Sequence, residues 1–356
     1  MMFALVLSNL AGGGAERAML RLAVALKRRG HGVRVIVLDP RIEHEVPPEL
    51  ELHTLDTRKG LLGAWLAARA LRGLYRRLGL GTDCVTISTL PFADLVAARA
   101  NVANLWCRIT NTLSAEIGDL ERASPSKAAR RLARYRRLYE GRNLVAVSDG
   151  VAADLRAGIG LRHARIVRIY NGFDLDAIRA AATQPEPDLP REPFVIHVGR
   201  FMPQKRHDVL LDAWQRAGLA HKLVLLAASS RELESLISKR GLQERVLVAG
   251  FRPNPYPWMR AAELLVLSSD REGMPNVLVE ALACGTRVVS TDCPSGPREV
   301  MRGALARFLV PPGHADALAA AMRAALAAPR PEASALPQEF AQARMVSAYE
   351  ALAAVQ

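Results

Sequence analysis

Short apolar runs alternate with amphipathic stretches along the whole chain. The first two runs, 3–8 and 33–38, flank a helical pattern at 16–29. A strand, a helix and a second strand in this order are expected to form a unit with parallel strands. Further strands are predicted at 50–55, 84–88, 104–109, 144–147, 166–170, 194–199, 223–227, 246–249, 264–267, 287–291 and 308–310. The alternation predicts an α/β fold with mostly parallel sheets covered by helices on both faces.

A proline-rich stretch at 173–193 interrupts this alternation. We therefore expect two Rossmann-like, doubly wound domains, an N-terminal one over 1–172 and a C-terminal one over 194–336, with 173–193 as the linker. The last segment, 337–356, is predicted to be a C-terminal helix, with a return to the N-terminal domain as one arrangement. Ligands bind at the carboxyl ends of the strands in such folds, so we expect the two domains to face each other across a cleft.

Composition limits the cellular setting of the 356-residue chain. Its four cysteines show no metal-binding spacing, which is typical of reduced thiols in a cytosolic protein. No apolar run is long enough for a transmembrane helix, and the start MMFALVLSNLAGGG lacks the basic residues of a signal peptide. We expect a cytoplasmic protein that is soluble or peripheral to a membrane.

The net charge of +13 and the pI of about 10.2 imply an anionic partner: nucleic acid, acidic lipid or a phosphorylated ligand. Two predicted helices, about 61–78 and 126–142, are both amphipathic and strongly basic. Such helices are either solvated surfaces or contacts for anionic lipid headgroups. The candidate membrane-facing residues are Arg69, Arg72, Arg76, Lys127, Arg130, Arg131, Arg134 and Arg137.

The stretch DREGMPNVLVEALACG at 270–285 carries two carboxylates, Glu272 in a loop and Glu280 on a helix. Gly273 and Pro275 favour a tight turn, and Asn276 is a candidate N-cap. Free amides at a helix start can bind a phosphate, and carboxylates beside it can accept hydrogen bonds from sugar hydroxyls. This chemistry suits a nucleotide sugar. A capped helix with one partly buried glutamate is the alternative.

Two cations are predicted at the same sheet edge as the Glu272 loop. Arg200 follows the strand at 194–199, and Lys205 lies where the next helix starts. Together they can neutralise a diphosphate as it becomes a leaving group. The alternative is a pair of surface cations in an arginine-rich chain.

The glycine turn at 12–14 does not form a dinucleotide-binding fingerprint, because Arg17 occupies the third glycine position. Taken together, however, GGGAER, VSDGVAADL, IYNGFDLD, HVGRFMPQKRHDVLL, REGMPNVLVEALACG and VVSTDCPSGPREV resemble the retaining glycosyltransferases of family 4, which have the GT-B fold. The resemblance spans roughly 12–312, and within the family the sequence is similar to bacterial enzymes that extend lipid-linked glycans or surface polysaccharides.

The resemblance implies a nucleotide-diphosphate sugar held mainly by the second domain and an acceptor held mainly by the first. Arg200 and Lys205 would grip the diphosphate, Glu272 the sugar hydroxyls and Glu280 the ribose hydroxyls. The donor would also meet the backbone around Gly273, Met274, Pro275 and Asn276, and Gly13 and Gly14 of the first domain.

In many relatives a histidine of the first domain contacts the sugar, but here that neighbourhood reads CRITNTLSAE. Arg108 and Asn111 are the candidates in its place. The triplet at 174–176 resembles a metal-binding DxD motif, but it lies in the predicted linker and GT-B enzymes are generally independent of metal. We therefore expect neither a metal ion nor another cofactor.

The resulting hypothesis is a retaining, metal-independent hexosyltransferase that uses a UDP-sugar, with a UDP-N-acetylhexosamine as one candidate. Its acceptor would be a lipid-linked glycan or a polysaccharide at the inner face of the cytoplasmic membrane. A nucleotide-sugar epimerase or sugar phosphorylase of the same architecture remains an alternative. A nucleic-acid-binding protein is a further one, although no nucleic-acid motif is present and the second basic helix offers only two tyrosines for stacking.

Overall fold

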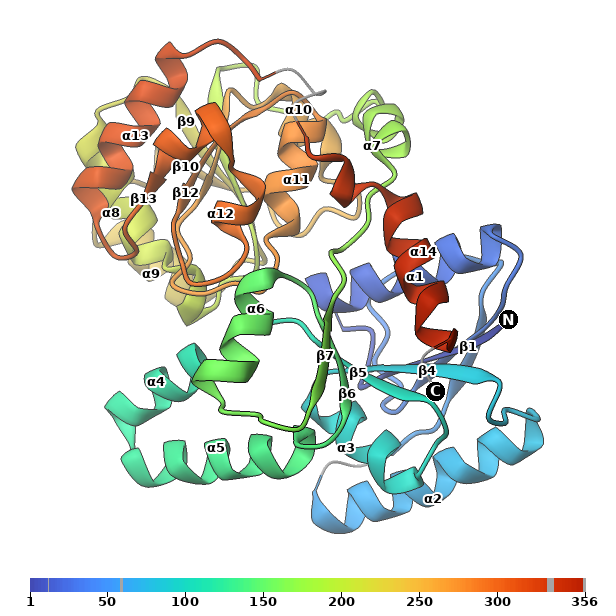
Figure 1. Ribbon diagram of the computed structural model, residues 1–356. Helices are drawn as coiled ribbons and strands as arrows, with labels where there is room; N and C mark the ends of the chain where they lie inside the picture. Colours follow the sequence, from blue (N-terminus) through green and yellow to red (C-terminus); the bar gives the residue numbers. More distant parts are fainter. Residues whose placement is uncertain (12, 58–59, 332–335, 355–356) are drawn as a thin grey trace. The chain divides into compact units, whose positions relative to one another are not determined.

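The computed structural model describes residues 1–11, 13–57, 60–331 and 336–354. It divides the chain into two compact units (Figure 1). Unit 1 comprises Met1–Phe173 and Gln338–Gln356, and unit 2 comprises Asp174–Pro337. The chain therefore leaves unit 1 once and returns to it.

Unit 1 is built on a seven-stranded parallel sheet with the strand order β3-β2-β1-β4-β5-β6-β7. Its strands are β1 (Met2–Leu7), β2 (Gly32–Val37), β3 (Glu51–Thr54), β4 (Cys84–Thr89), β5 (Leu105–Ile109), β6 (Asn143–Ala146) and β7 (Arg165–Arg168). The order reverses between β1 and β4, which makes this the switch point of a doubly wound sheet.

Alternating side chains of β1 divide the core of unit 1 into two layers. Phe3 and Leu5 pack in one cluster with residues of α1 (Gly14–Arg28) and α14 (Gln342–Ala351). Ala4 and Val6 pack in the other with residues of α2 (Leu61–Arg77) and α3 (Pro91–Ala100). The remaining helices are α4 (Leu113–Ala123), α5 (Pro125–Tyr139) and α6 (Asp149–Ala153).

Unit 2 repeats the plan with six parallel strands in the order β10-β9-β8-β11-β12-β13. The strands are β8 (Phe194–Val198), β9 (Lys222–Leu226), β10 (Val246–Val248), β11 (Leu264–Leu267), β12 (Arg287–Thr291) and β13 (Leu309–Val310). The helices are α7 (Leu175–Ala182), α8 (His207–Ala217), α9 (Arg231–Ser238), α10 (Tyr256–Ala261), α11 (Asn276–Ala283), α12 (Pro297–Val300) and α13 (Ala315–Ala327). The strand order of unit 2 reverses between β8 and β11, as that of unit 1 does between β1 and β4.

The predicted α/β class is confirmed: each predicted strand is present in the described residues, within two positions of its expected bounds. Other boundaries differ. The basic helix predicted to reach 142 ends at Tyr139, and the stretch predicted as a linker contains α7, which packs on α10 of unit 2. Gly12 of the predicted glycine turn lies outside the described residues.

The two crossings between the units run side by side within unit 1. The Phe173 amide donates to Phe340 O at 2.8 Å, and the Gln342 amide donates to Phe173 O at 3.0 Å. Position 172 requires a glycine, because a Cβ there would lie 2.7 Å from Cβ of Met345. The outgoing chain is thus hydrogen-bonded to the returning one.

A buried carboxylate joins three elements of unit 1. Asp94 of α3 accepts hydrogen bonds from Ser88 Oγ of β4 at 2.6 Å and from the Tyr139 hydroxyl of α5 at 2.8 Å. Burial raises the pKa of Asp94 to about 7 despite these two donors. The basic helix α5 is therefore attached to the core through a group that titrates near neutral pH.

Asp94 should make the stability of unit 1 fall as pH rises from about 4 to 7. The folded state keeps the proton up to about pH 7, whereas the unfolded chain loses it near pH 3.8. The expected slope approaches 1.4 kcal/mol per pH unit within this window. Asp94→Asn should remove it, as measured by urea unfolding of both proteins at pH 5, 6, 7 and 8. Parallel curves for the two proteins would contradict this assignment.

Candidate functional site

Two loops meet where neighbouring strands of unit 2 end. Strands β8 and β11 are paired in parallel, so the loops that follow them, 199–206 and 268–275, leave from the same edge of the sheet. Ser268 Oγ donates to Lys205 O at 2.7 Å, and the Asp270 amide donates to Gln204 O at 2.9 Å. These bonds hold the two loops together along their length.

Lys205 and Glu272, predicted separately from sequence, form an ion pair between these loops. Lys205 Nζ donates to Glu272 Oε1 at 2.6 Å, and Ser269 Oγ donates to the same oxygen at 2.6 Å. Glu272 is 8% exposed. A buried carboxylate is therefore held in one orientation beside the half-buried side chain of Lys205.

A third loop, after β12, packs against the Glu272 loop. Its Gly296 has φ +91°, and a Cβ there would lie 2.4 Å from Cδ of Pro275 and 3.0 Å from Gly273 O. Burial, and then the negative charge of Glu272, raise the pKa of the Cys293 thiol in the same loop. No role was predicted for either residue from the sequence, although both lie in the stretch VVSTDCPSGPREV.

Glu280 lies on α11 and is 4% exposed. The prediction that Asn276 caps this helix is wrong: Asn276 is its first residue, and Pro275 precedes it without a side-chain cap bond. The amides of Asn276 and Leu278 donate to the carbonyls of Met274 and Pro275, both at 3.0 Å. The anion site expected at this helix start therefore has fewer available amides than predicted.

Arg200 is the exposed cation of the site. It lies two residues after β8 and forms no ion pair or hydrogen bond with any residue in the described ranges. Its guanidinium is therefore available to a ligand, whereas the ammonium group of Lys205 is already paired.

Two histidines lie beneath the loop that carries Lys205. His197 Nδ1 is 2.9 Å from Val266 O, and its ring meets that of His207 edge to face at 4.7 Å. Burial, and then the charge of Lys205, lower the pKa of His207 to about 4. Burial, and then the charge of His207, lower the pKa of His197 well below its usual range. Both rings are neutral at physiological pH. No spacing in the sequence indicated this pair.

The candidates in unit 1 have their own local partners. Gly13 precedes α1, and a Cβ there would lie 1.9 Å from the Glu16 carboxylate, so Glu16 folds back over it. Gly14 is the first residue of α1. The predicted contacts of both glycines with a donor phosphate stay predictions.

Arg108 and Asn111 differ in their surroundings. Arg108 is 3% exposed on β5 and donates to Asn171 Oδ1 at 2.5 Å, and burial lowers its pKa. Asn111 is half-buried and its Oδ1 accepts from the Thr112 amide at 2.9 Å. Arg108 thus has a partner within the core of unit 1, and the predicted sugar contact of either residue stays a prediction.

The DxD triplet has a local role in the helix that it starts. Asp174 Oδ1 accepts from the Ala177 amide at 3.0 Å and caps α7, and Asp176 pairs with Arg179 at 2.9 Å. In the described part of the chain, no three His, Cys, Asp or Glu side chains are grouped so as to hold a metal ion.

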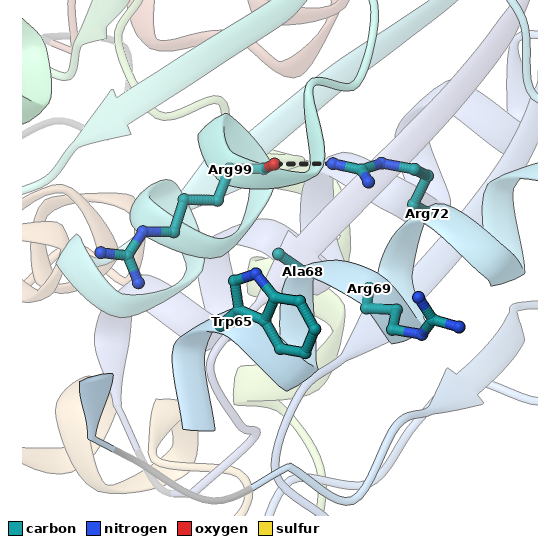
Figure 2. A pocket seen from close by; sticks show the side chains of 5 residues that line it. All are labelled: Trp65, Ala68, Arg69, Arg72 and Arg99. Carbon is teal, nitrogen blue, oxygen red and sulfur yellow. Dashed lines mark hydrogen bonds between the residues drawn. The ribbon is translucent and has the colours of Figure 1, made fainter. Parts of the chain in front are cut away.

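A separate surface hollow of about 470 Å³ lies between α2 and α3 (Figure 2). Trp65, Arg69 and Arg72 of α2 and Arg99 of α3 line it. Arg72 donates to the carbonyls of Arg99 at 3.0 Å and Ala100 at 3.1 Å, and so caps the end of α3. The indole of Trp65 and the guanidinium of Arg69 are exposed beside it.

Helix α5 presents most of the other predicted surface cations. Arg131 pairs with Glu116 of α4. Lys127, Arg130, Arg134 and Arg137 are exposed. No helix in the described ranges combines the length and apolar character that crossing a bilayer requires.

Comparisons with known proteins agree with this architecture. Residues 12–177 match the family model described as Glycosyltransferase Family 4, and 192–328 match Glycosyl transferases group 1. The chain is 31% identical over 304 residues to the N-acetylgalactosamine-N,N'-diacetylbacillosaminyl-diphospho-undecaprenol 4-alpha-N-acetylgalactosaminyltransferase of Campylobacter jejuni, covering 82% of this chain and 81% of that protein.

Two further similarities are more distant. The lipopolysaccharide 1,6-galactosyltransferase of Salmonella typhimurium is 27% identical over 48% of this chain and 49% of its own length. The crystal structure of Anabaena HepE in complex with UDP-glucose superposes with a TM-score of 0.77 at 22% identity, covering all of both chains. This superposition supports the expected GT-B fold.

Gly296→Ala should destabilise unit 2 by about 2 to 4 kcal/mol, because the new methyl group combines an unfavourable backbone conformation with a clash against Pro275. Gly303→Ala is the matched control: its φ is +57°, but a Cβ there meets nothing within 4 Å. The control should lose only about 1 kcal/mol. Chemical unfolding of both variants measures the difference, and equal losses would mean that the contact between the loops is unimportant.

Proposed function

The chain belongs to glycosyltransferase family 4, and on this basis we propose that it transfers a sugar from a nucleotide-diphosphate donor to a lipid-linked or polysaccharide acceptor with retention of anomeric configuration. The observation that carries the proposal is the pairing of Lys205 with Glu272, with Arg200 exposed nearby, at the carboxyl edge of the unit 2 sheet. This group supplies cations for a diphosphate and a carboxylate for sugar hydroxyls within one set of loops.

The two cations provide the stabilisation that the leaving group needs. Breaking the bond between the sugar and the diphosphate places negative charge on a phosphate oxygen, and Arg200 and Lys205 would neutralise it. This arrangement supports transfer without a metal ion. The acceptor proton would pass to a donor phosphate oxygen, so no protein base is required. Product with inverted configuration would exclude this mechanism.

Glu272 is proposed to bind the sugar and not to attack it. Its Oε1 accepts hydrogen bonds from Lys205 and Ser269. Ser269 remains a donor to this oxygen when Lys205 turns to the diphosphate, and its bond lowers the electron density available for nucleophilic attack. A carboxylate fixed in this way is suited to accept hydrogen bonds from hydroxyl groups. Glu280, buried on α11, is proposed to bind the ribose hydroxyls.

A UDP-sugar is the proposed donor. The solved structure of Anabaena HepE contains UDP-glucose, and the name of the Campylobacter relative specifies transfer of an N-acetylgalactosaminyl group to a diphospho-undecaprenol acceptor. The HepE structure supports a uridine donor, and the Campylobacter name supports an N-acetylhexosamine as the sugar, so UDP-N-acetylhexosamine is the first donor to test.

The enzyme is further proposed to act at the cytoplasmic membrane face through α2 and α5. Among the side chains of α2 that the structure describes, Leu62 (73%), Trp65 (58%) and Leu66 (50%) are large, apolar and exposed, and they lie next to Arg69. Apolar side chains bordered by cations are typical of helices that lie in a membrane interface. Helix α5 adds exposed cations without exposed large apolar groups, as expected for contact with headgroups alone. Because Arg72 and Arg131 have partners within unit 1, the proposed membrane contact relies on the other cations of α2 and α5.

Glu280→Ala should weaken donor binding. UDP, GDP, ADP and their common sugars are compared by thermal shift, and a ligand at 100 times its dissociation constant should stabilise the wild type by about 2.7 kcal/mol. We expect only uridine compounds to do so, and the shift to shrink in Glu280→Ala. Turnover should be unchanged by a chelator.

Glu263→Ala is the control, since this half-buried glutamate directly precedes β11, at the end of the strand opposite the Glu272 loop. If no nucleotide shifts the wild type, the proposed donor class is wrong.

Arg69→Glu with Arg76→Glu should reduce binding to vesicles that contain phosphatidylglycerol. Each basic residue near an anionic surface contributes about 1 kcal/mol, so sedimentation with these vesicles should weaken at least about tenfold. Arg191→Glu with Arg231→Glu makes the same change in net charge on unit 2 and should leave binding nearly unchanged. Equal binding of the wild type to phosphatidylcholine and phosphatidylglycerol vesicles would rule out the membrane proposal.

A further inference from the structure

Arg206 has a backbone conformation that is unusual for its residue type. Its φ of 48° and ψ of 53° lie in the left-handed region, at the junction between the 3₁₀ turn Pro203–Lys205 and α8. A residue with a Cβ pays roughly 1 kcal/mol for this conformation, and glycine adopts it freely. An arginine in this conformation suggests that contacts of its side chain offset the strain.

The guanidinium of Arg206 bridges two carboxylates on different segments. Nε and Nη2 each donate to Asp208 at 2.9 Å, at the start of α8. Nη1 donates to both oxygens of Asp270 at 3.1 and 2.9 Å, in the loop after β11. Bridging of this kind uses the fixed planar geometry of arginine, which a lysine cannot reproduce.

The contacts of Arg206 connect the two segments that carry Lys205 and Glu272. Arg206 directly follows Lys205 in the chain, and its partner Asp270 lies two residues before Glu272. The side chain therefore joins the turn that carries the cation to the loop that carries the carboxylate. Its hydrogen bonds go to Asp208 and Asp270, whereas Glu272 Oε1 accepts from Lys205 Nζ and from Ser269.

We propose that Arg206 is a positioning residue for the donor site, which keeps the Glu272 loop in place when Lys205 turns from Glu272 to the donor diphosphate. The inference rests on the proposed function. In the free enzyme, the Lys205–Glu272 pair itself helps to hold the two loops together. Donor binding draws Lys205 toward phosphate, and this contact is then weakened. The bridge from Arg206 to Asp270 remains, so Glu272 keeps its orientation toward the sugar.

Arg206→Gly tests the role because glycine removes the bridge and relieves the backbone strain at once. Affinities for UDP and for the best-binding UDP-sugar are measured by calorimetry, together with the melting temperature. We expect the UDP-sugar to bind about tenfold more weakly and UDP only about threefold more weakly, because the displaced group contacts the sugar. The melting temperature should change little. Arg206→Lys should give an intermediate loss, since lysine keeps the charge but makes only a point contact.

Arg216→Ala is the control. This substitution removes one cation and the surface ion pair between Arg216 and Asp316, away from the site. It should leave the affinities for UDP and for the UDP-sugar unchanged.

Three results would overturn the inference: unchanged affinities in Arg206→Gly, equal losses for UDP and the UDP-sugar, or a large fall in melting temperature, which would mean a general structural role. If the wild type binds neither UDP nor any UDP-sugar, the proposed function fails instead. The two failures are therefore distinguishable.

Discussion

The ion pair between Lys205 and Glu272 depends on the parallel arrangement of β8 and β11. Because parallel neighbours end at the same edge, a cation after one strand and a carboxylate after the other meet there although 67 positions separate them in sequence. The two charges neutralise each other in a largely buried setting. In the proposed function, a diphosphate would replace the carboxylate as the partner of Lys205, and Glu272 would accept hydrogen bonds from hydroxyls. On that proposal the same pair joins the two loops and supplies both kinds of contact.

The strands could be predicted because buried parallel strands are short, continuous apolar runs, and these runs stand out between the amphipathic helices. The same logic predicted that Lys205 and Glu272 lie at one sheet edge. What the sequence left open depends on contacts between distant segments. Gly296 matters because it meets Pro275, and the neutrality of His197 follows from its burial against His207. Neither contact leaves a periodic or local signal. The error at Asn276 has a similar cause, since Pro275 and the backbone bonds around Met274 begin the helix differently from an ordinary side-chain cap.

Some arginines that the helical pattern predicts to face solvent have partners within unit 1. Arg72 and Arg131 fit the basic pattern of their helices, yet Arg72 caps α3 and Arg131 pairs with Glu116. Long side chains can reach neighbouring elements that a helical projection does not include. The structure also separates two helices that looked equivalent. Only α2 exposes large apolar residues beside its cations, whereas α5 turns its tyrosines inward, to Asp94 and Glu116.

The high pI therefore reflects the charge of α2 and α5 more than the charge of the candidate site in unit 2. Helix α2 carries four arginines and α5 carries six basic residues, ten in all, and neither helix contains an acidic residue. In unit 2, by contrast, Lys205 and Arg206 are matched by Glu272, Asp208 and Asp270. A net charge of +13 thus lies largely on two helices of unit 1. An excess of charge acts over about a Debye length, whereas the paired charges of unit 2 act at contact distance, so the two helices dominate the attraction of the protein to an anionic partner.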